Sequence, residues 1–123
     1  MQAFSFFSLG TMLLVSIQED IGDVEVSRMF DSLCRQVSEK KIHGVIVDLH
    51  NVEVVDSYMA GHLQGMEAAL RLLHARMVVV GLSVPVVMTL TDFGIRLSGL
   101  QFALDVEHAV IKLEELLQHD RHG

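Results

Sequence analysis

The run Gly44-Val-Ile-Val-Asp-Leu49 is the clearest strand signal in the chain. Its apolar residues do not alternate with polar ones, as they would in a strand with one face in water. A strand without alternation is typical of a parallel sheet covered on both faces. The run Met77-Val-Val-Val-Gly-Leu82 repeats the pattern. These two runs predict buried strands of a mostly parallel sheet.

Two weaker strand signals lie nearer the ends of the chain. Met12-Leu-Leu-Val-Ser-Ile17 is short, apolar and partly β-branched, and a polar turn over residues 18–23 follows it. The phenylalanines among residues 4–7 either extend this strand or form a hairpin with it across Gly10. A last, weak strand is expected over residues 100–103.

Four helices are predicted between and after these strands. The first runs from Asp23, a possible N-cap, to the Lys40-Lys41 pair, and the second spans residues 57–74. The third runs from Pro85 to Gly94, and the fourth starts after Asp105. Apolar residues at helical spacing mark the faces expected to be buried: Val26, Met29, Phe30, Leu33, Cys34 and Val37 in the first helix, Met59, Leu63, Met66, Leu70 and Leu73 in the second, and Ala109, Val110, Leu113, Leu116 and Leu117 in the fourth.

Strands and helices thus alternate along a chain of 123 residues. That length suits one domain, because two halves of it would each bury too little apolar surface. Alternation requires right-handed crossovers and a mostly parallel sheet. We predict a single α/β domain over residues 1–118, with about four helices and a frayed tail over residues 119–123.

The net charge of −7 disfavours DNA, RNA and anionic membranes as partners. No apolar run reaches the roughly 18 to 20 residues of a membrane span. The apolar start of the chain lacks the positive flank of a signal peptide, since no Lys or Arg precedes Arg28. Cys34, the single cysteine, fits a reducing compartment. We therefore expect a cytoplasmic protein.

No group of residues predicts catalysis, a metal or a cofactor. Glycine-rich phosphate loops are missing, since Gly61 and Gly65 fall inside a helical pattern. The histidines are scattered, and the closest pair, His119 and His122, lies in the expected tail. Cys34 has no adjacent histidine and is interpreted as a packing residue.

Ser57 is the residue most open to a functional interpretation. It stands at the start of the second predicted helix, where a serine is most often the N-cap. The alternative is a regulated phosphate acceptor, because the helix N-terminus tolerates a phosphate while the surface gains negative charge. Asp56 sets a carboxylate beside the hydroxyl, either to hold or present the serine or simply as a loop residue.

A row of small residues continues from Ser57 on the side of the helix away from the predicted core. Gly61, Gly65 and Ala68 would form a smooth face for a docking protein, together with Asp56, Ser57 and Tyr58. The alternative is tight packing of the glycines against a neighbouring helix or loop.

At these residues the chain resembles the STAS family, the sulfate transporter and anti-sigma factor antagonist domain, over nearly its whole length. The likeness lies in the order of elements, the Asp56-Ser57 pair, Gly81 after the third strand, and the segment from Pro85 to Gly94. Simple antagonists of the family carry an Asp-Ser-Ser-Gly type pattern, whereas this chain has Asp56-Ser57-Tyr58-Met59-Ala60-Gly61. That departure, with Leu13 to Gln18 and Thr89 to Ile95, resembles the RsbS-type scaffold branch.

The resemblance implies a non-enzymatic scaffold that assembles with RsbR-type paralogues into a large stressosome. It would sequester an RsbT-type serine kinase, release it when Ser57 is phosphorylated, and be reset by an RsbX-type phosphatase. Thr89 matches a threonine that is phosphorylated in the RsbR branch, although a helix threonine usually bonds its own backbone.

Two other functions stay open. One is a simple antagonist that binds an anti-sigma kinase one to one, with phosphorylation of Ser57 ending the interaction. The other is an enzyme or small-ligand carrier that uses a pocket beside the first residues of the second helix.

Overall fold

The computed structural model describes residues 3–18, 21–92, 94, 97 and 99–122. Its strands are β1 (Phe4–Leu9), β2 (Met12–Ile17), β3 (Gly44–Asp48), β4 (Arg76–Val80) and β5 (Gln101–Phe102). Its helices are α1 (Asp23–Lys40), α2 (Ser57–Leu72), α3 (Val84–Asp92) and α4 (Val106–His122). The predicted α/β class and number of helices are confirmed.

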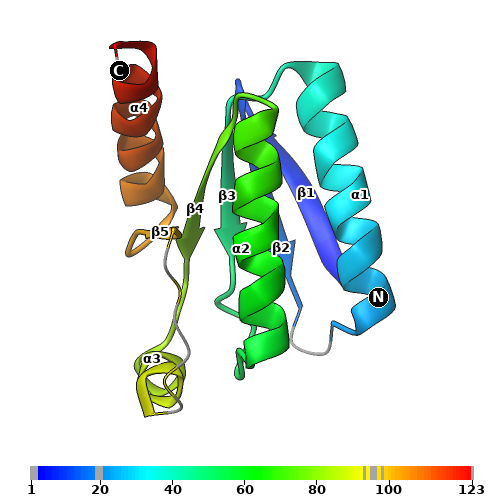
Figure 1. Cartoon of the computed structure of the whole chain (residues 1–123), viewed down its shortest axis with the longest axis vertical. Helices are drawn as coiled ribbons and strands as arrows, with labels where there is room; N and C mark the ends of the chain where they lie inside the picture. Colours follow the sequence, from blue (N-terminus) through cyan, green and yellow to red (C-terminus); the bar gives the residue numbers. More distant parts are fainter. Residues whose placement is uncertain (1–2, 19–20, 93, 95–96, 98, 123) are drawn as a thin grey trace.

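The five strands form one sheet in the order β1-β2-β3-β4-β5 (Figure 1). β1 runs antiparallel to β2, and the other neighbours are parallel. The residues before β2 therefore form a hairpin with it, and Gly10 adopts a φ of +65° in the turn. Such a φ costs glycine little, because it has no Cβ.

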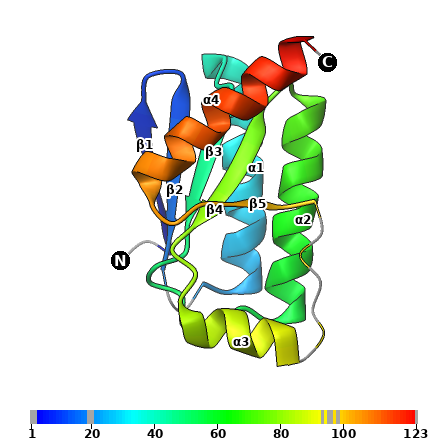
Figure 2. The same cartoon turned by 90° about the vertical axis from the view of Figure 1, so that its left-hand side faces the viewer.

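Helices cover both faces of the sheet, which explains the missing alternation in β3 and β4. α1 and α2 lie over one face, where Val45, Val47 and Leu49 of β3 and its turn join their core. α4 covers the opposite face of the sheet (Figure 2). Ile46 of β3 faces that side and packs with Ala109 and Leu113 of α4. The valine, leucine and isoleucine side chains among these residues are fully buried, and each contributes roughly 1.5–3 kcal/mol to folding.

Several predicted details differ from the structure. Gly22 is the N-cap of α1, and Asp23 is the first residue of the helix. Leu73 is 38% exposed, because α2 ends at Leu72 and the chain turns there to begin β4. Gly94 follows the end of α3, and its N–H bonds to Thr91, but Ile95 at the end of the predicted motif lies outside the described residues.

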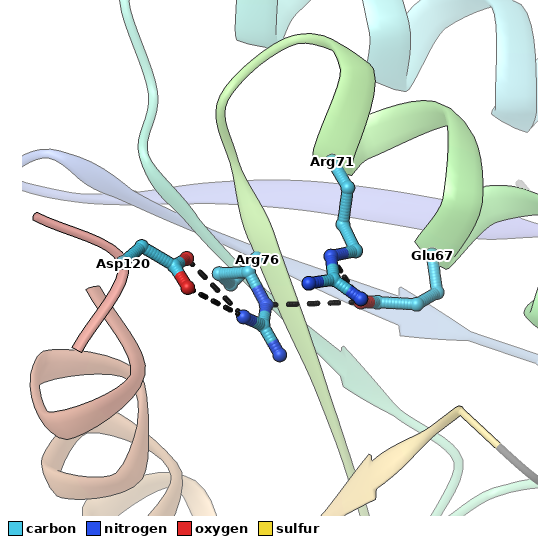
Figure 3. A network of polar contacts seen from close by, with 4 residues as sticks. All are labelled: Glu67, Arg71, Arg76 and Asp120. Carbon is cyan, nitrogen blue, oxygen red and sulfur yellow. Dashed lines mark hydrogen bonds and ion pairs between the residues drawn. The ribbon is translucent and has the colours of Figure 1, made fainter. Parts of the chain in front are cut away.

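The prediction of a frayed tail is also wrong, because α4 continues through residues 119–122. Asp120 in its last turn bonds Nη1 of Arg76 on β4 through both carboxylate oxygens, at 3.0 and 3.2 Å. Arg76 in turn lies 3.7 Å from the buried carboxylate of Glu67 on α2, measured from Nε to Oε1 (Figure 3). The last turn of α4 is therefore attached to the sheet by a side chain from the interior.

Candidate functional site

The N-terminus of α2 follows the turn that leaves β3, and Asp56 is its N-cap. The Asp56 carboxylate accepts a hydrogen bond from the Met59 N–H at 2.8 Å, with extended backbone at the cap residue. The interpretation of Ser57 as the cap is therefore wrong by one residue. Asp56 is also more than a loop residue, since a capping oxygen satisfies a backbone donor that the helix leaves free.

Ser57 is the first residue of α2, and its side chain is exposed. No described residue forms a hydrogen bond with its hydroxyl, because the capping bond is made by Asp56. Within the described chain, the N–H groups of Ser57 and Tyr58 also have no acceptor. Free N–H groups and the positive end of the helix dipole favour an anion at this position. The geometry is compatible with a phosphorylated Ser57.

The predicted small face of α2 is open to solvent. Gly61, Gly65 and Ala68 are all exposed. A Cβ added at Gly61 or Gly65 would meet no described heavy atom within 4 Å outside the helix itself. The alternative of tight packing against a neighbouring element is therefore wrong for both glycines. All six residues predicted for docking share the exposed surface of one helix and its cap.

α1 contributes to the same surface, which the sequence did not indicate. Phe30 of α1 lines a shallow groove with Ser57, Gly61 and Gly65 of α2. His62 lies in the same groove, and its ring packs edge-on against the Tyr58 ring with centroids 4.4 Å apart. The four-residue spacing of Tyr58 and His62 could have predicted this pair. Phe30 could not be found, because its spacing assigns it to the core.

The turn before α2 is held at the carboxyl end of β3. The Asp48 carboxylate accepts a hydrogen bond from the His50 N–H at 2.9 Å and pairs with His50 Nδ1 at 2.7 Å. Gly81, which follows β4 with a φ of +83°, packs closely against this turn. A Cβ there would lie 2.6 Å from the His50 nitrogen. Only glycine fits at this contact, so Gly81 helps to position the chain that leads to Ser57.

Thr89 lies on α3, close to the same end of the sheet as the N-terminus of α2 (Figure 1). Its side chain is half-buried, and its hydroxyl donates to the Pro85 carbonyl at 2.9 Å. This is the backbone bond expected of a threonine inside a helix. Thr89 is thus less available for modification than Ser57.

Other chemistry finds little support in the described residues. Among them, no three His, Cys, Asp or Glu side chains gather in a way that could hold a metal ion. None of the described helices is long and apolar enough to cross a membrane. Burial, followed by the nearby Asp31 charge, raises the pKa of the Cys34 thiol, which disfavours its reactive thiolate form.

Solved structures include close matches to this fold. A serine-to-glutamate variant of RsbS from Moorella thermoacetica is 25% identical, with a TM-score of 0.78 over 94% of this chain and 97% of that one. A chain from a structure of the stressosome, a signal integration and transduction hub, is 27% identical, with a TM-score of 0.75 over 91% of this chain and 97% of that one. The unphosphorylated anti-sigma factor antagonist SpoIIAA is 15% identical, with a TM-score of 0.65 over 97% and 98%, and shows the fold alone.

No curated protein matches the sequence. Residues 8–109, however, match the family model of the STAS domain. The match includes β2 to β5, the capped N-terminus of α2 and the exposed Ser57. On this evidence, the chain belongs to the STAS domain family.

Proposed function

We propose that this protein is a non-enzymatic, cytoplasmic scaffold subunit of a stressosome, regulated by phosphorylation of Ser57. It assembles with RsbR-type STAS paralogues and sequesters an RsbT-type serine kinase. Phosphorylation of Ser57 by that kinase ends the interaction, and an RsbX-type phosphatase restores it. The downstream response is a stress-signalling pathway.

The observation that carries this proposal is the free hydroxyl of Ser57. Asp56 makes the capping bond, so phosphorylation removes no hydrogen bond that holds the helix. Modification therefore leaves the fold intact and changes the surface. The added charge takes the formal net charge from −7 to about −9.

The surface beside Ser57 supports a docking role. Tyr58 is 50% exposed and supplies an apolar ring with a polar tip, while Gly61 and Gly65 let a partner approach the backbone. A phosphate at Ser57 would stand at one end of this face. Its desolvation under a bound partner is costly, so phosphorylation weakens docking.

The similarity to RsbS and to a stressosome chain favours the scaffold over a simple antagonist. These two matches are 25% and 27% identical to this chain, whereas the antagonist SpoIIAA is 15% identical. In a one-to-one antagonist, the same serine would control a small complex with an anti-sigma kinase. The two functions therefore differ in the size of the assembly.

The first test is phosphorylation by an RsbT-type kinase encoded beside this protein. With ATP, we expect one phosphate on the protein, located at Ser57 by mass spectrometry. Ser57→Ala should abolish it, whereas Ser38→Ala, at an exposed serine of α1, should leave it unchanged. Phosphorylation that persists in Ser57→Ala would contradict the assignment of the site. If only Thr89→Ala abolished phosphorylation, the modified residue would be Thr89 on α3.

The second test measures binding and assembly. Ser57→Asp should weaken kinase binding at least about tenfold, while Ser57→Ala retains it. Mixing with an RsbR-type partner should give a large particle by light scattering and electron microscopy. A small one-to-one complex with a kinase, and no large particle, would favour the antagonist.

A further inference from the structure

A basic pocket lies at the end of the sheet opposite Ser57. It has a volume of about 400 Å³, within the range of small-molecule sites. Its polar lining comes from the residue before β3, the end of α2, the start of β4 and the last turns of α4. These residues are His43, Arg71, His74, Arg76, Asp120 and Arg121. Four separate segments of the chain therefore converge on one pocket.

The charge of this pocket is opposite to that of the whole protein. Three of the six arginines lie here, although the net charge is −7. Asp120 and the adjacent Glu67 supply two negative charges, which leaves one positive charge before either histidine is protonated. In the described chain, the side chains of His43, His74 and Arg121 have no ion-pair partner. The pocket therefore holds one arginine and two imidazoles that no described residue pairs with, whereas Arg71 Nε lies 3.9 Å from Oε1 of Glu67.

Arg76 provides the fixed donor of the pocket. It is 8% exposed, and β4 holds its backbone within the sheet. Nη1 bonds Asp120 and Nε faces Glu67, as Figure 3 shows, while no described residue accepts a hydrogen bond from Nη2. A guanidinium held in this way is pre-organised for an oxyanion.

The groups at the C-terminal ends of α2 and α4 indicate which class of ligand the pocket could bind. Basic residues are common at helix C-termini, where they offset the negative end of the dipole, and this explains Arg71 and Arg121 in part. It does not explain Arg76 in a strand or His43 before one. The Asp120 carboxylate lies among these cations, and beyond its two hydrogen bonds from Arg76 it has lone pairs that can accept hydroxyl groups. The complementary ligand combines an oxyanion with hydroxyl groups.

We propose that this pocket binds a small phosphate monoester that carries hydroxyl groups. A phosphate dianion presents three acceptor oxygens and close to two charges, which suits arginines that converge from different elements. A carboxylate presents two oxygens in one plane. The site is independent of Ser57, because the two lie at opposite ends of the strands.

The experiment is a titration followed by NMR chemical shifts of His43 and His74. The probes are ribose 5-phosphate, inorganic phosphate and ribose, at constant ionic strength. We expect saturable shifts with ribose 5-phosphate, weaker ones with inorganic phosphate and none with ribose. Tighter binding of inorganic phosphate than of ribose 5-phosphate would overturn the role of the hydroxyl groups, and no saturation with ribose 5-phosphate would overturn the site.

Variants locate the binding site. Arg71→Gln and Arg121→Gln should each weaken ribose 5-phosphate binding about tenfold, because each removes a charge-assisted bond. Both side chains are exposed, so folding should persist. Arg35→Gln on α1 is the matched control and should bind as the wild type does. Equal affinity in all three variants would refute the proposal.

Discussion

Replacing Asp120 with asparagine should destabilise the protein substantially, although the residue lies in the last turn of α4. The carboxylate makes both of its contacts, at 3.0 and 3.2 Å, to an arginine whose side chain is 9% exposed. Removing one partner of a fully buried ion pair costs about 3–5 kcal/mol. Asp120 is itself 39% exposed, and Glu67 remains near Arg76, so solvent and a second carboxylate reduce the loss. We expect a loss of about 2 kcal/mol.

The assay is urea denaturation at pH 7, with a thermal melt in parallel. A loss of that size should lower Tm by about 6–10 °C for a domain of this length. Glu114→Gln removes the same charge from an exposed position of α4 and should stay within about 0.5 kcal/mol of the wild type. If Asp120→Asn behaves like this control, the last turn of α4 is not anchored and the reasoning is wrong.

Three further predictions concern positions where the structure imposes a specific constraint. Gly81→Ala should lower the free energy of unfolding by at least about 2 kcal/mol in urea, because of its φ of +83° and the close His50 nitrogen, and an unchanged midpoint would contradict this. The side-chain hydrogen bond to Asp105 raises the pKa of His108, so protonated His108 stabilises the fold below its ordinary pKa, and this is lost as pH rises through the folded value. Asp105→Ala should lower that pKa in an NMR titration, and an unchanged midpoint would exclude the pair as its cause. Burial, partly offset by Arg76 and Arg71, raises the pKa of Glu67, so ionisation of this group lowers stability as pH rises above the ordinary value of 4.5. Glu67→Gln should remove that fall in a series of urea titrations from acid to neutral pH, whereas parallel curves for both proteins would refute it.

The proposed docking face was predictable in part, because helical spacing alone places Gly61, Gly65 and Ala68 on one side of a helix. The second wall of the groove, which Phe30 of α1 forms, was not predictable. Phe30 is half-buried, packing partly on the core and partly into the groove. The spacing of apolar residues on α1 cannot distinguish a core residue from a groove residue. The way α1 and α2 pack against each other decides whether a partly buried ring lines the groove.

The identity of the cap shows a similar limit. Asp56 and Ser57 are both good capping residues, and they are adjacent. Which one caps depends on the residue at which the backbone leaves the extended conformation. The turn from β3 determines that residue. His50 holds this turn through its contacts with Asp48 at the end of β3 and with Gly81, which follows β4. A difference of one residue decides whether the Ser57 hydroxyl is occupied or free.

The α/β class, the order of elements and the two doubly buried strands could be predicted from local patterns in the chain. Burial on both faces leaves a local pattern in the chain, because successive residues of such a strand face opposite sides and most of them must be apolar. Tertiary structure alone decided that Asp56 caps α2, that Gly61 and Gly65 face solvent, and that the last turn of α4 is anchored by Asp120. These features depend on contacts between distant segments. Arg76 and Asp120 are 44 residues apart, and only the packed sheet and helices bring them together.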